Sequence, residues 1–162
     1  MMISIKYASH LPVLTRLLPT TTGPVLELGI GLYSTPYLHW ICSASRRQLT
    51  SYDSDPKWIR YFRDAKSDIH EVALIDDWDK MPIDMFWDIA FIDHAPDHRR
   101  SIEAKRLANN AKYLILHDTE PEVDSLYGYS QIYPLFKYRY DYTLAKPYTT
   151  ICINQYCNNR IP

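Results

Sequence analysis

The chain is poor in cysteine and glycine and has no long hydrophobic run: its 162 residues include three Cys and four Gly. Cys42, Cys152 and Cys157 are odd in number and lack metal-ligand spacing, so we expect reduced thiols in a reducing compartment, with Cys42 in the core. No apolar run approaches the length of a membrane span, and residues 1–6 lack the apolar stretch of a secretory signal. We therefore expect a soluble, cytoplasmic protein without a membrane partner.

The chain also lacks an excess of either charge. Its 18 Lys and Arg residues nearly balance its 19 Asp and Glu residues, for a formal net charge of -1. This balance provides no bulk attraction to nucleic acid or to a membrane surface. At 46% hydrophobic residues the chain can bury a core of its own. We expect one domain over residues 1–162, with an N-terminal helix and lead-in over 1–23, and the oligomeric state cannot be inferred.

Short apolar stretches alternate with segments of helical periodicity, and two β-rich segments follow. The expected strands cover 25–30, 48–53, 72–75, 86–93, 113–118, 135–144 and 148–153. Helices are expected from the cap candidate Ser9, from Thr35-Pro36 and Asp55-Pro56 as cap and first residue, and over 97–109 and 122–129. This alternation predicts an α/β fold: a Rossmann-like, open, mostly parallel seven-stranded sheet with an antiparallel C-terminal β pair and helices on both faces.

Fourteen tyrosines are present, concentrated after Leu126. Their β-propensity and amphipathic packing on a half-buried sheet explain them most simply. A role in stacking against a substrate is the alternative.

The first expected strand leads into a glycine turn and a helix start within residues 24–36. Gly29 and Gly31 allow a tight turn and a close approach of a ligand to the backbone. The free N–H groups of the following helix attract anionic or polar ligand atoms. Glu27 interrupts the apolar strand, and a buried carboxylate requires a partner. That partner is either a ligand or, as the structural alternative, a cation in a buried ion pair.

Acidic residues end the next four expected strands, at Asp53, Asp76-Asp77, Asp93 and Asp118. A single Asp at such a position is most often a cap for the next helix. Because ligands of open α/β sheets bind at the carboxyl ends of the strands, four in register predict a ligand-binding edge.

The glycine turn and the acidic strand ends, in their order along the chain, resemble the motifs of class I S-adenosylmethionine-dependent methyltransferases. The stretch 25–31 with Ser34-Thr35 resembles the first motif of that family, and Asp53 matches its ribose-binding acid. Residues 91–93 and 114–119 resemble a small-molecule branch that carries Ile-Asp-Gly after strand four and His-Asp after strand five. The resemblance implies a methyltransferase of a small-molecule hydroxyl or amine. The cofactor-binding residues that it implies are Glu27, Gly29, Gly31, Ser34, Asp53, Ser54, Asp77, Trp78 and Asp93.

A nicotinamide dinucleotide is the main rival ligand, because Gly29-Ile30-Gly31 fits both fingerprints. The dinucleotide motif requires glycine or alanine at position 34, where this chain has Ser34. Glu27 would also repel a pyrophosphate, whereas it could accept a hydrogen bond from the ammonium group of S-adenosylmethionine, directly or through water.

The expected catalytic residues are Asp93, His94 and Asp118. Asp93 and Asp118 end neighbouring strands and could hold Mg²⁺ or another divalent ion that lowers the pKa of a substrate hydroxyl. The catechol O-methyltransferase type places Asn after the second acid, whereas this chain has Thr119, which argues against a metal. His94 could be a general base. His117 alternates with Asp118, so we expect it to face the other side of the sheet.

Two other functions remain open at this point. The domain could bind S-adenosylmethionine as a regulatory or partner subunit without turnover, or it could cleave the cofactor. Analysis of the reaction products would separate these three possibilities.

Overall fold

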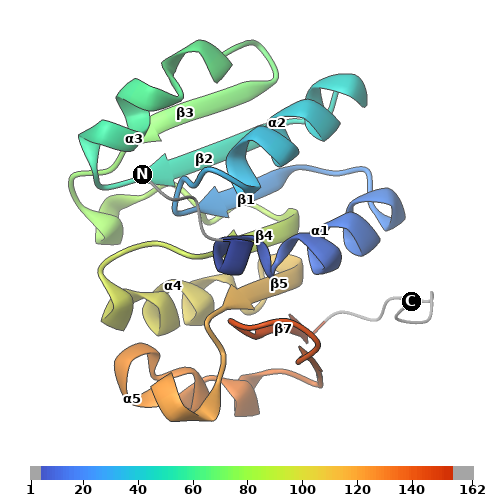
Figure 1. Ribbon diagram of the computed structural model, residues 1–162, viewed down its shortest axis with the longest axis vertical. Helices are drawn as coiled ribbons and strands as arrows, with labels where there is room; N and C mark the ends of the chain where they lie inside the picture. Colours follow the sequence, from blue (N-terminus) through green and yellow to red (C-terminus); the bar gives the residue numbers. More distant parts are fainter. Residues whose placement is uncertain (1–4, 155–162) are drawn as a thin grey trace.

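A computed structural model describes residues 5–154 of the chain. Seven strands form one sheet in the order β3-β2-β1-β4-β5-β7-β6 (Figure 1). Strand β7 is antiparallel to both of its neighbours, and the first five strands pair in parallel. The predicted Rossmann-like sheet with its antiparallel C-terminal pair is confirmed. The strands are β1 (Val25–Leu28), β2 (Leu49–Asp53), β3 (His70–Leu74), β4 (Trp87–Ile92), β5 (Ala111–His117), β6 (Tyr138–Tyr142) and β7 (Thr149–Ile153).

Helices cover both faces of this sheet (Figure 1). The α-helices are α1 (Leu11–Leu17), α2 (Ser34–Ala44), α3 (Pro56–Tyr61), α4 (Arg100–Leu107) and α5 (Asp124–Tyr127). Short 3₁₀ turns include η1 (Ile5–Ala8) before α1, η4 (Trp78–Lys80) and η5 (Asp97–Arg99).

Successive strand residues point to opposite faces, which divides the core into two clusters. Val25 and Phe91 pack with side chains of α1 and α2 on one face. Leu26 and Ile92 pack with Ala104 and other residues of α4 on the opposite face. The parallel strands are buried on both faces, which explains their nearly continuous apolar sequences.

The helix starts test the capping predictions individually. Asp55 is the N-cap of α3 and accepts a hydrogen bond from Lys57 N at 2.8 Å, as predicted. The prediction of Thr35 as an N-cap was wrong, because α2 begins at Ser34 and Thr35 lies inside its first turn. Ser9 is not the cap of α1 either: His10 occupies that position and provides no side-chain cap.

Cys42 and Cys152 are free and buried, and Cys42 lies in the core as expected. Cys157 lies outside the described residues. Across residues 5–154, no helix has the length and apolar character needed to cross a bilayer.

Candidate active site

A cavity of about 610 Å³ lies at the carboxyl ends of the parallel strands. Its volume falls within the range of about 300–1,000 Å³ that is typical of small-molecule sites. The wall consists of the segment before α1, the turn after β1, the ends of β2, β4 and β5, and the starts of α3 and α4. The lining residues are Tyr7, His10, Ile30, Gly31, Leu32, Tyr33, Ser34, Asp53, Ser54, Asp55, Trp58, Asp93, Ala95, Arg100, His117 and Asp118.

The two glycines of the turn after β1 are constrained in different ways. Gly29 has φ +100°, and a Cβ there would lie 2.4 Å from the backbone carbonyl of Asp93. The fold therefore requires glycine at position 29, because the backbone just after β4 passes directly against the end of β1 there. Gly31 lines the cavity, and a Cβ there would meet only the Ser34 hydroxyl at 3.5 Å.

Glu27 is fully buried beneath this turn and is not part of the cavity wall. Its carboxyl group accepts hydrogen bonds from Thr35 Oγ1 at 2.9 Å and from Ser51 Oγ. Thr35 Oγ1 also accepts the Gly31 N–H at 2.9 Å, so Glu27 is linked to the glycine turn through Thr35. Burial raises the pKa of Glu27 to about 7, although hydrogen bonds from the Ser34, Ser51 and Thr35 hydroxyl groups oppose the shift.

Neither proposed partner of Glu27 is present in direct contact. Among the described residues, no Lys or Arg pairs with its carboxyl group, so the alternative of a buried ion pair is not what the structure contains. The side chain is also separated from the cavity, which leaves support of the turn as the role that the geometry favours.

Asp53 joins the end of β2 to the glycine turn and lines the cavity. One carboxylate oxygen accepts the Ile30 N–H at 2.8 Å, and the other accepts the Asp55 N–H at 2.7 Å. Burial raises the pKa of Asp53, and these backbone hydrogen bonds oppose the shift. Because each carboxylate oxygen has two acceptor sites, Asp53 retains capacity for hydroxyl donors of a ligand.

Arg100 lies between the two carboxylates that were considered as metal ligands. Its Nη2 is 3.0 Å from Asp93 Oδ1, and its Nη1 is 2.8 Å from Asp118 Oδ2. Arg100 Nε also donates to the backbone oxygen of His94 at 2.7 Å, which fixes the guanidinium in place. A cation already bridges Asp93 and Asp118, so the structure does not support the predicted Mg²⁺ site between them.

The same ion pairs set the protonation of the cluster. Burial alone would lower the pKa of Arg100, but the charges of Asp93 and Asp118 outweigh burial and raise it. Burial would raise the pKa of Asp93, whereas His117 and Arg100 outweigh it and lower the pKa. Asp93 is therefore an ionised acceptor and a weak base.

His117 lies at the cavity beside Asp93, contrary to the expectation that it faces away. Strand β5 ends at His117, and Asp118 adopts a left-handed backbone with φ 55°. His117 follows Ile115 by two residues and Asp93 follows Phe91 by two, and Ile115 pairs with Phe91 in the sheet, so both side chains lie on the face covered by α1. His117 Nδ1 is 3.2 Å from Asp93 Oδ1 and 3.6 Å from Asp118 Oδ2. His117 Nε2 is 2.9 Å from Ser9 Oγ.

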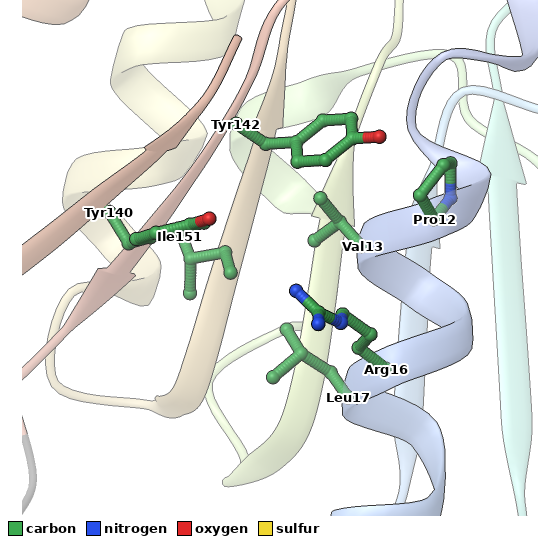
Figure 2. Close-up of a pocket in the computed structure, with 7 residues that line it drawn as sticks. All are labelled: Pro12, Val13, Arg16, Leu17, Tyr140, Tyr142 and Ile151. Atoms are coloured by element: carbon green, nitrogen blue, oxygen red, sulfur yellow. The ribbon is translucent and has the colours of Figure 1, made fainter. Parts of the chain in front are cut away.

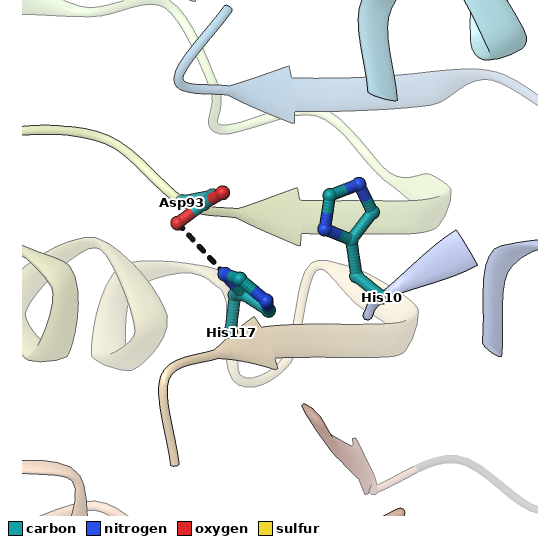
Figure 3. Close-up of side chains that lie close together, drawn as sticks. All are labelled: His10, Asp93 and His117. Carbon is teal, nitrogen blue, oxygen red and sulfur yellow. Dashed lines mark hydrogen bonds and ion pairs between the residues drawn. The ribbon is translucent and has the colours of Figure 1, made fainter. Parts of the chain in front are cut away.

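His10 completes this end of the cavity from the start of α1 (Figure 3). Its ring packs edge-to-face against His117 at 4.9 Å and lies 4.8 Å from the ring of Phe91. Within the described residues neither ring nitrogen has a hydrogen-bond partner, although only 2% of the residue is exposed. Burial and the neighbouring His117 lower the pKa of His10 to about 3, so the imidazole is neutral.

Five of the predicted site residues are not part of the cavity lining: Glu27 and Gly29, described above, and His94, Trp78 and Asp77. His94 is buried, stacks on Trp78 at 4.1 Å, and has its Nε2 3.5 Å from Glu103 Oε2, so it does not face a reacting group. Trp78 packs in the core. Asp77 instead caps the turn η4 by accepting the Asp79 N–H at 3.0 Å. Asp77 follows β3, which is the edge strand of the sheet and contributes no residue to the cavity lining.

The structure brings together the other predicted residues Gly31, Ser34, Asp53, Ser54, Asp93 and Asp118. His10 and Arg100 line the cavity but were not predicted as site residues, and His117 was expected to face away from the site. No local sequence pattern marks His10 or Arg100 as a site residue. Among the described tyrosines after Leu126, none lines the cavity.

A second hollow lies between α1 and the strands β6 and β7 (Figure 2). Its volume of about 20 Å³ is enough for about one water molecule and not for a metabolite. Its lining residues are Pro12, Val13, Arg16, Leu17, Tyr140, Tyr142 and Ile151.

The main cavity carries more negative than positive charge. Its lining includes the carboxylates of Asp53, Asp55, Asp93 and Asp118, and Arg100 is the single Lys or Arg residue among the lining residues. This distribution favours a cationic ligand and disfavours the pyrophosphate of a dinucleotide.

No protein-family model and no curated protein sequence matches the chain. Solved structures do match. Human methyltransferase-like protein 13 in complex with SAH aligns with TM-score 0.64 at 15% identity, over 95% of this chain and 83% of that one. The N-methyltransferase NodS from Bradyrhizobium japonicum WM9, in complex with S-adenosyl-L-homocysteine, aligns with TM-score 0.60 at 12% identity, over 88% and 83%. Cofactor-bound Rv0187 from MTB aligns with TM-score 0.65 at 14% identity, over 96% and 83%.

These similarities establish that the chain has the class I methyltransferase fold, as the resemblance of its motifs implied.

Proposed function

We propose that this protein is an S-adenosylmethionine-dependent methyltransferase that acts on a hydroxyl or amine group of a small molecule. The observation that carries the proposal is the acidic cavity at the strand ends, which the glycine turn and Asp53 form together. S-adenosylmethionine is a cation that would supply an electrophilic methyl group, and bound S-adenosylhomocysteine in solved structures of this fold supports the choice of cofactor.

We assign the cofactor end of the cavity to the turn after β1 and to Asp53. Asp53 would accept hydrogen bonds from the ribose hydroxyls, with Ser54 beside it, and Gly31 and Ser34 would line the methionine portion. Helix α2 has no side-chain cap, so its first N–H groups are available to a ligand carboxylate. Glu27 would act as a positioning residue through Thr35. We do not assign the adenine to Asp77 or Trp78, because both lie outside the cavity.

We assign the acceptor to the end formed by Asp93, Arg100, Asp118 and the two histidines. The carboxylates would hold and orient the acceptor, which methyl transfer requires. Asp93 and Asp118 are both paired with Arg100, the single Lys or Arg residue of the lining. This end of the cavity therefore offers no unpaired Lys or Arg side chain to an anionic substrate. A neutral or cationic acceptor therefore fits better than a phosphorylated or carboxylated one.

The test begins with binding. Calorimetry with S-adenosylhomocysteine should show binding to the wild-type protein, and Asp53→Ala should weaken it by about 1–3 kcal/mol, because the ribose hydroxyls lose their acceptor. Asp68→Ala is the matched control, since Asp68 is an exposed carboxylate outside the cavity. Unchanged affinity in a folded Asp53→Ala protein would remove Asp53 from the site.

Product analysis then separates the three possible functions. Methyl transfer yields S-adenosylhomocysteine together with a methylated acceptor when a pool of small alcohols and amines is supplied. Cleavage yields adenosyl fragments of other mass. Binding without either product would instead identify a regulatory subunit.

A further inference from the structure

A buried imidazole without partners marks the acceptor end of the cavity. His10 is 2% exposed, yet neither Nδ1 nor Nε2 has a hydrogen-bond partner among the described residues. Buried polar groups are nearly always paired, so this ring points to a ligand that the protein alone does not supply. The ring lines the cavity beside His117 and Asp93 (Figure 3).

We propose that His10, Asp93 and His117 bind one divalent transition-metal ion of the Zn²⁺ class. One ligand atom from each residue lies within 4.8 Å of the others. Bonds of about 2.0–2.2 Å to a tetrahedral Zn²⁺ place ligand atoms about 3.4 Å apart. His117 Nδ1 and Asp93 Oδ1 are already 3.2 Å apart, so only the ring of His10 has to move closer.

The donor set determines which ion fits. Two imidazoles and one carboxylate suit Zn²⁺, Fe²⁺, Ni²⁺ or Cu²⁺, whereas Mg²⁺ and Ca²⁺ prefer oxygen ligands throughout. The proposed site therefore differs from the Asp93–Asp118 site expected from the sequence in both its ligands and its metal.

Ser9 holds His117 in the orientation that metal binding requires. Its hydroxyl is 2.9 Å from His117 Nε2, which turns Nδ1 toward Asp93. In the metal-free protein Nδ1 donates its proton to Asp93 Oδ1. A metal ion at Nδ1 would displace that proton, and Nε2–H would then donate to Ser9. Metal-binding histidines typically donate their other N–H in this way. Two adjacent residues, Ser9 and His10, thus provide one ligand and the support for another.

The charges around the cluster also accommodate a divalent ion. Arg100 contacts Oδ1 of Asp93, and a carboxylate oxygen has two acceptor sites, so Oδ1 can bind the metal beside His117 Nδ1 while it keeps this contact. Asp93 and Asp118 together carry two negative charges against the one positive charge of Arg100. Because the guanidinium fills the gap between the two carboxylates, the ion is directed to the histidine side.

The metal would narrow the acceptor class, and this consequence rests on the proposed function. A Zn²⁺-class ion binds an alcohol or phenol oxygen and lowers its pKa. The Asp93 carboxylate is already engaged by Arg100 and His117, so metal activation of a hydroxyl group fits this cavity better than deprotonation of the acceptor by Asp93.

The test is titration of the metal-free protein, without cofactor, using Zn²⁺ in calorimetry and Co²⁺ in visible absorption. One ion per chain is expected, with Co²⁺ bands typical of nitrogen and oxygen ligands. His10→Ala and His117→Ala should each weaken Zn²⁺ binding about 10-fold or more. His98→Ala is the matched control, because His98 is exposed and lies outside the cluster.

Two further measurements keep the test decisive if an alanine variant fails to fold. His10→Phe keeps an aromatic ring against Phe91 but removes both nitrogens, so it should fold and still lose Zn²⁺. Absence of Zn²⁺ binding by the wild-type protein, or equal affinity in the folded His10→Phe variant, would overturn the site. Calorimetry with S-adenosylhomocysteine runs in parallel: lost cofactor binding with retained Zn²⁺ binding would reject the proposed function alone.

Discussion

Glu27 shows how a single carboxyl group can serve the site without touching a ligand. Its hydrogen bonds with Thr35 and Ser51 tie the glycine turn to β2 and to the first turn of α2. Ser51 Oγ is in turn 2.8 Å from His70 Nε2, so the carboxyl group belongs to a buried polar chain. A group of this kind couples the stability of the turn to pH.

Glu27 should make the protein less stable as the pH rises from about 4.5 to 7. The folded state raises its pKa to about 7 from the model-compound value of 4.5, so the folded protein keeps a proton that the unfolded chain releases. The free energy of unfolding should fall across this window by about 3 kcal/mol, at 1.36 kcal/mol per pKa unit. Urea denaturation of wild-type protein and Glu27→Gln should show the variant gaining relative stability toward pH 8.

The exposed Glu122→Gln substitution is the control for this series. A wild-type-to-Glu27→Gln difference that stays constant between pH 5 and 8 would show that Glu27 does not titrate in this window.

At the level of the elements, the turn between β1 and α2 carries two glycines with separate purposes. Gly29 allows β1 and β4 to converge, and Gly31 leaves the cavity wall without a side chain. Stability and ligand binding should therefore respond to different substitutions within one turn.

Gly29→Ala should destabilise the fold by at least about 2 kcal/mol, because it combines a positive φ with a clash against the Asp93 backbone. Gly31→Ala should change stability by no more than about 0.5 kcal/mol, since its Cβ finds an ordinary contact. Chemical denaturation measures both, and equal losses would contradict the division of roles. Among variants that fold, Gly31→Ala should lose more affinity for S-adenosylhomocysteine than Gly29→Ala, as measured by calorimetry.

Elements with strong local signals could be predicted from the sequence. The apolar strands and the Asp55-Pro56 helix start lie where the sequence places them, within about two residues for most strands. Thr35 failed as a cap because its hydroxyl is engaged by Glu27 and Gly31, which no local pattern reveals.

The candidate site was predictable only where it follows strand ends. Asp53, Asp93 and Asp118 reach the cavity because parallel strands end at one edge. His117 shares the face of Ile115 two residues earlier, but which face the cavity occupies there depends on how the N-terminal segment packs on the sheet. The position of His10 depends on a contact with His117, which lies 107 residues further along the chain. Such features arise from tertiary packing, and periodicity does not encode them.

For the whole molecule, the proposed cofactor should act as a stabilising ligand. S-adenosylhomocysteine at about 100 times its Kd adds about 2.7 kcal/mol, which corresponds to a Tm increase of about 5–10 °C for a chain of this size. Thermal denaturation monitored by circular dichroism measures this shift.

Nicotinamide dinucleotide at equal concentration is the control, because the surplus of carboxylates in the cavity should repel its pyrophosphate. A larger Tm increase with the dinucleotide than with S-adenosylhomocysteine would reverse the choice of cofactor.

The wall formed by Tyr7 and His10 belongs to the lead-in that precedes α1, not to the sheet or its connecting helices. Shortening the chain to begin at Leu11 would spare both core clusters while removing one side of the chamber. A sample trimmed in that way could pass every check of folding and still be inert. Purification strategies that place affinity handles or protease sites near the start of the chain should therefore be judged by metal content as well as by circular dichroism.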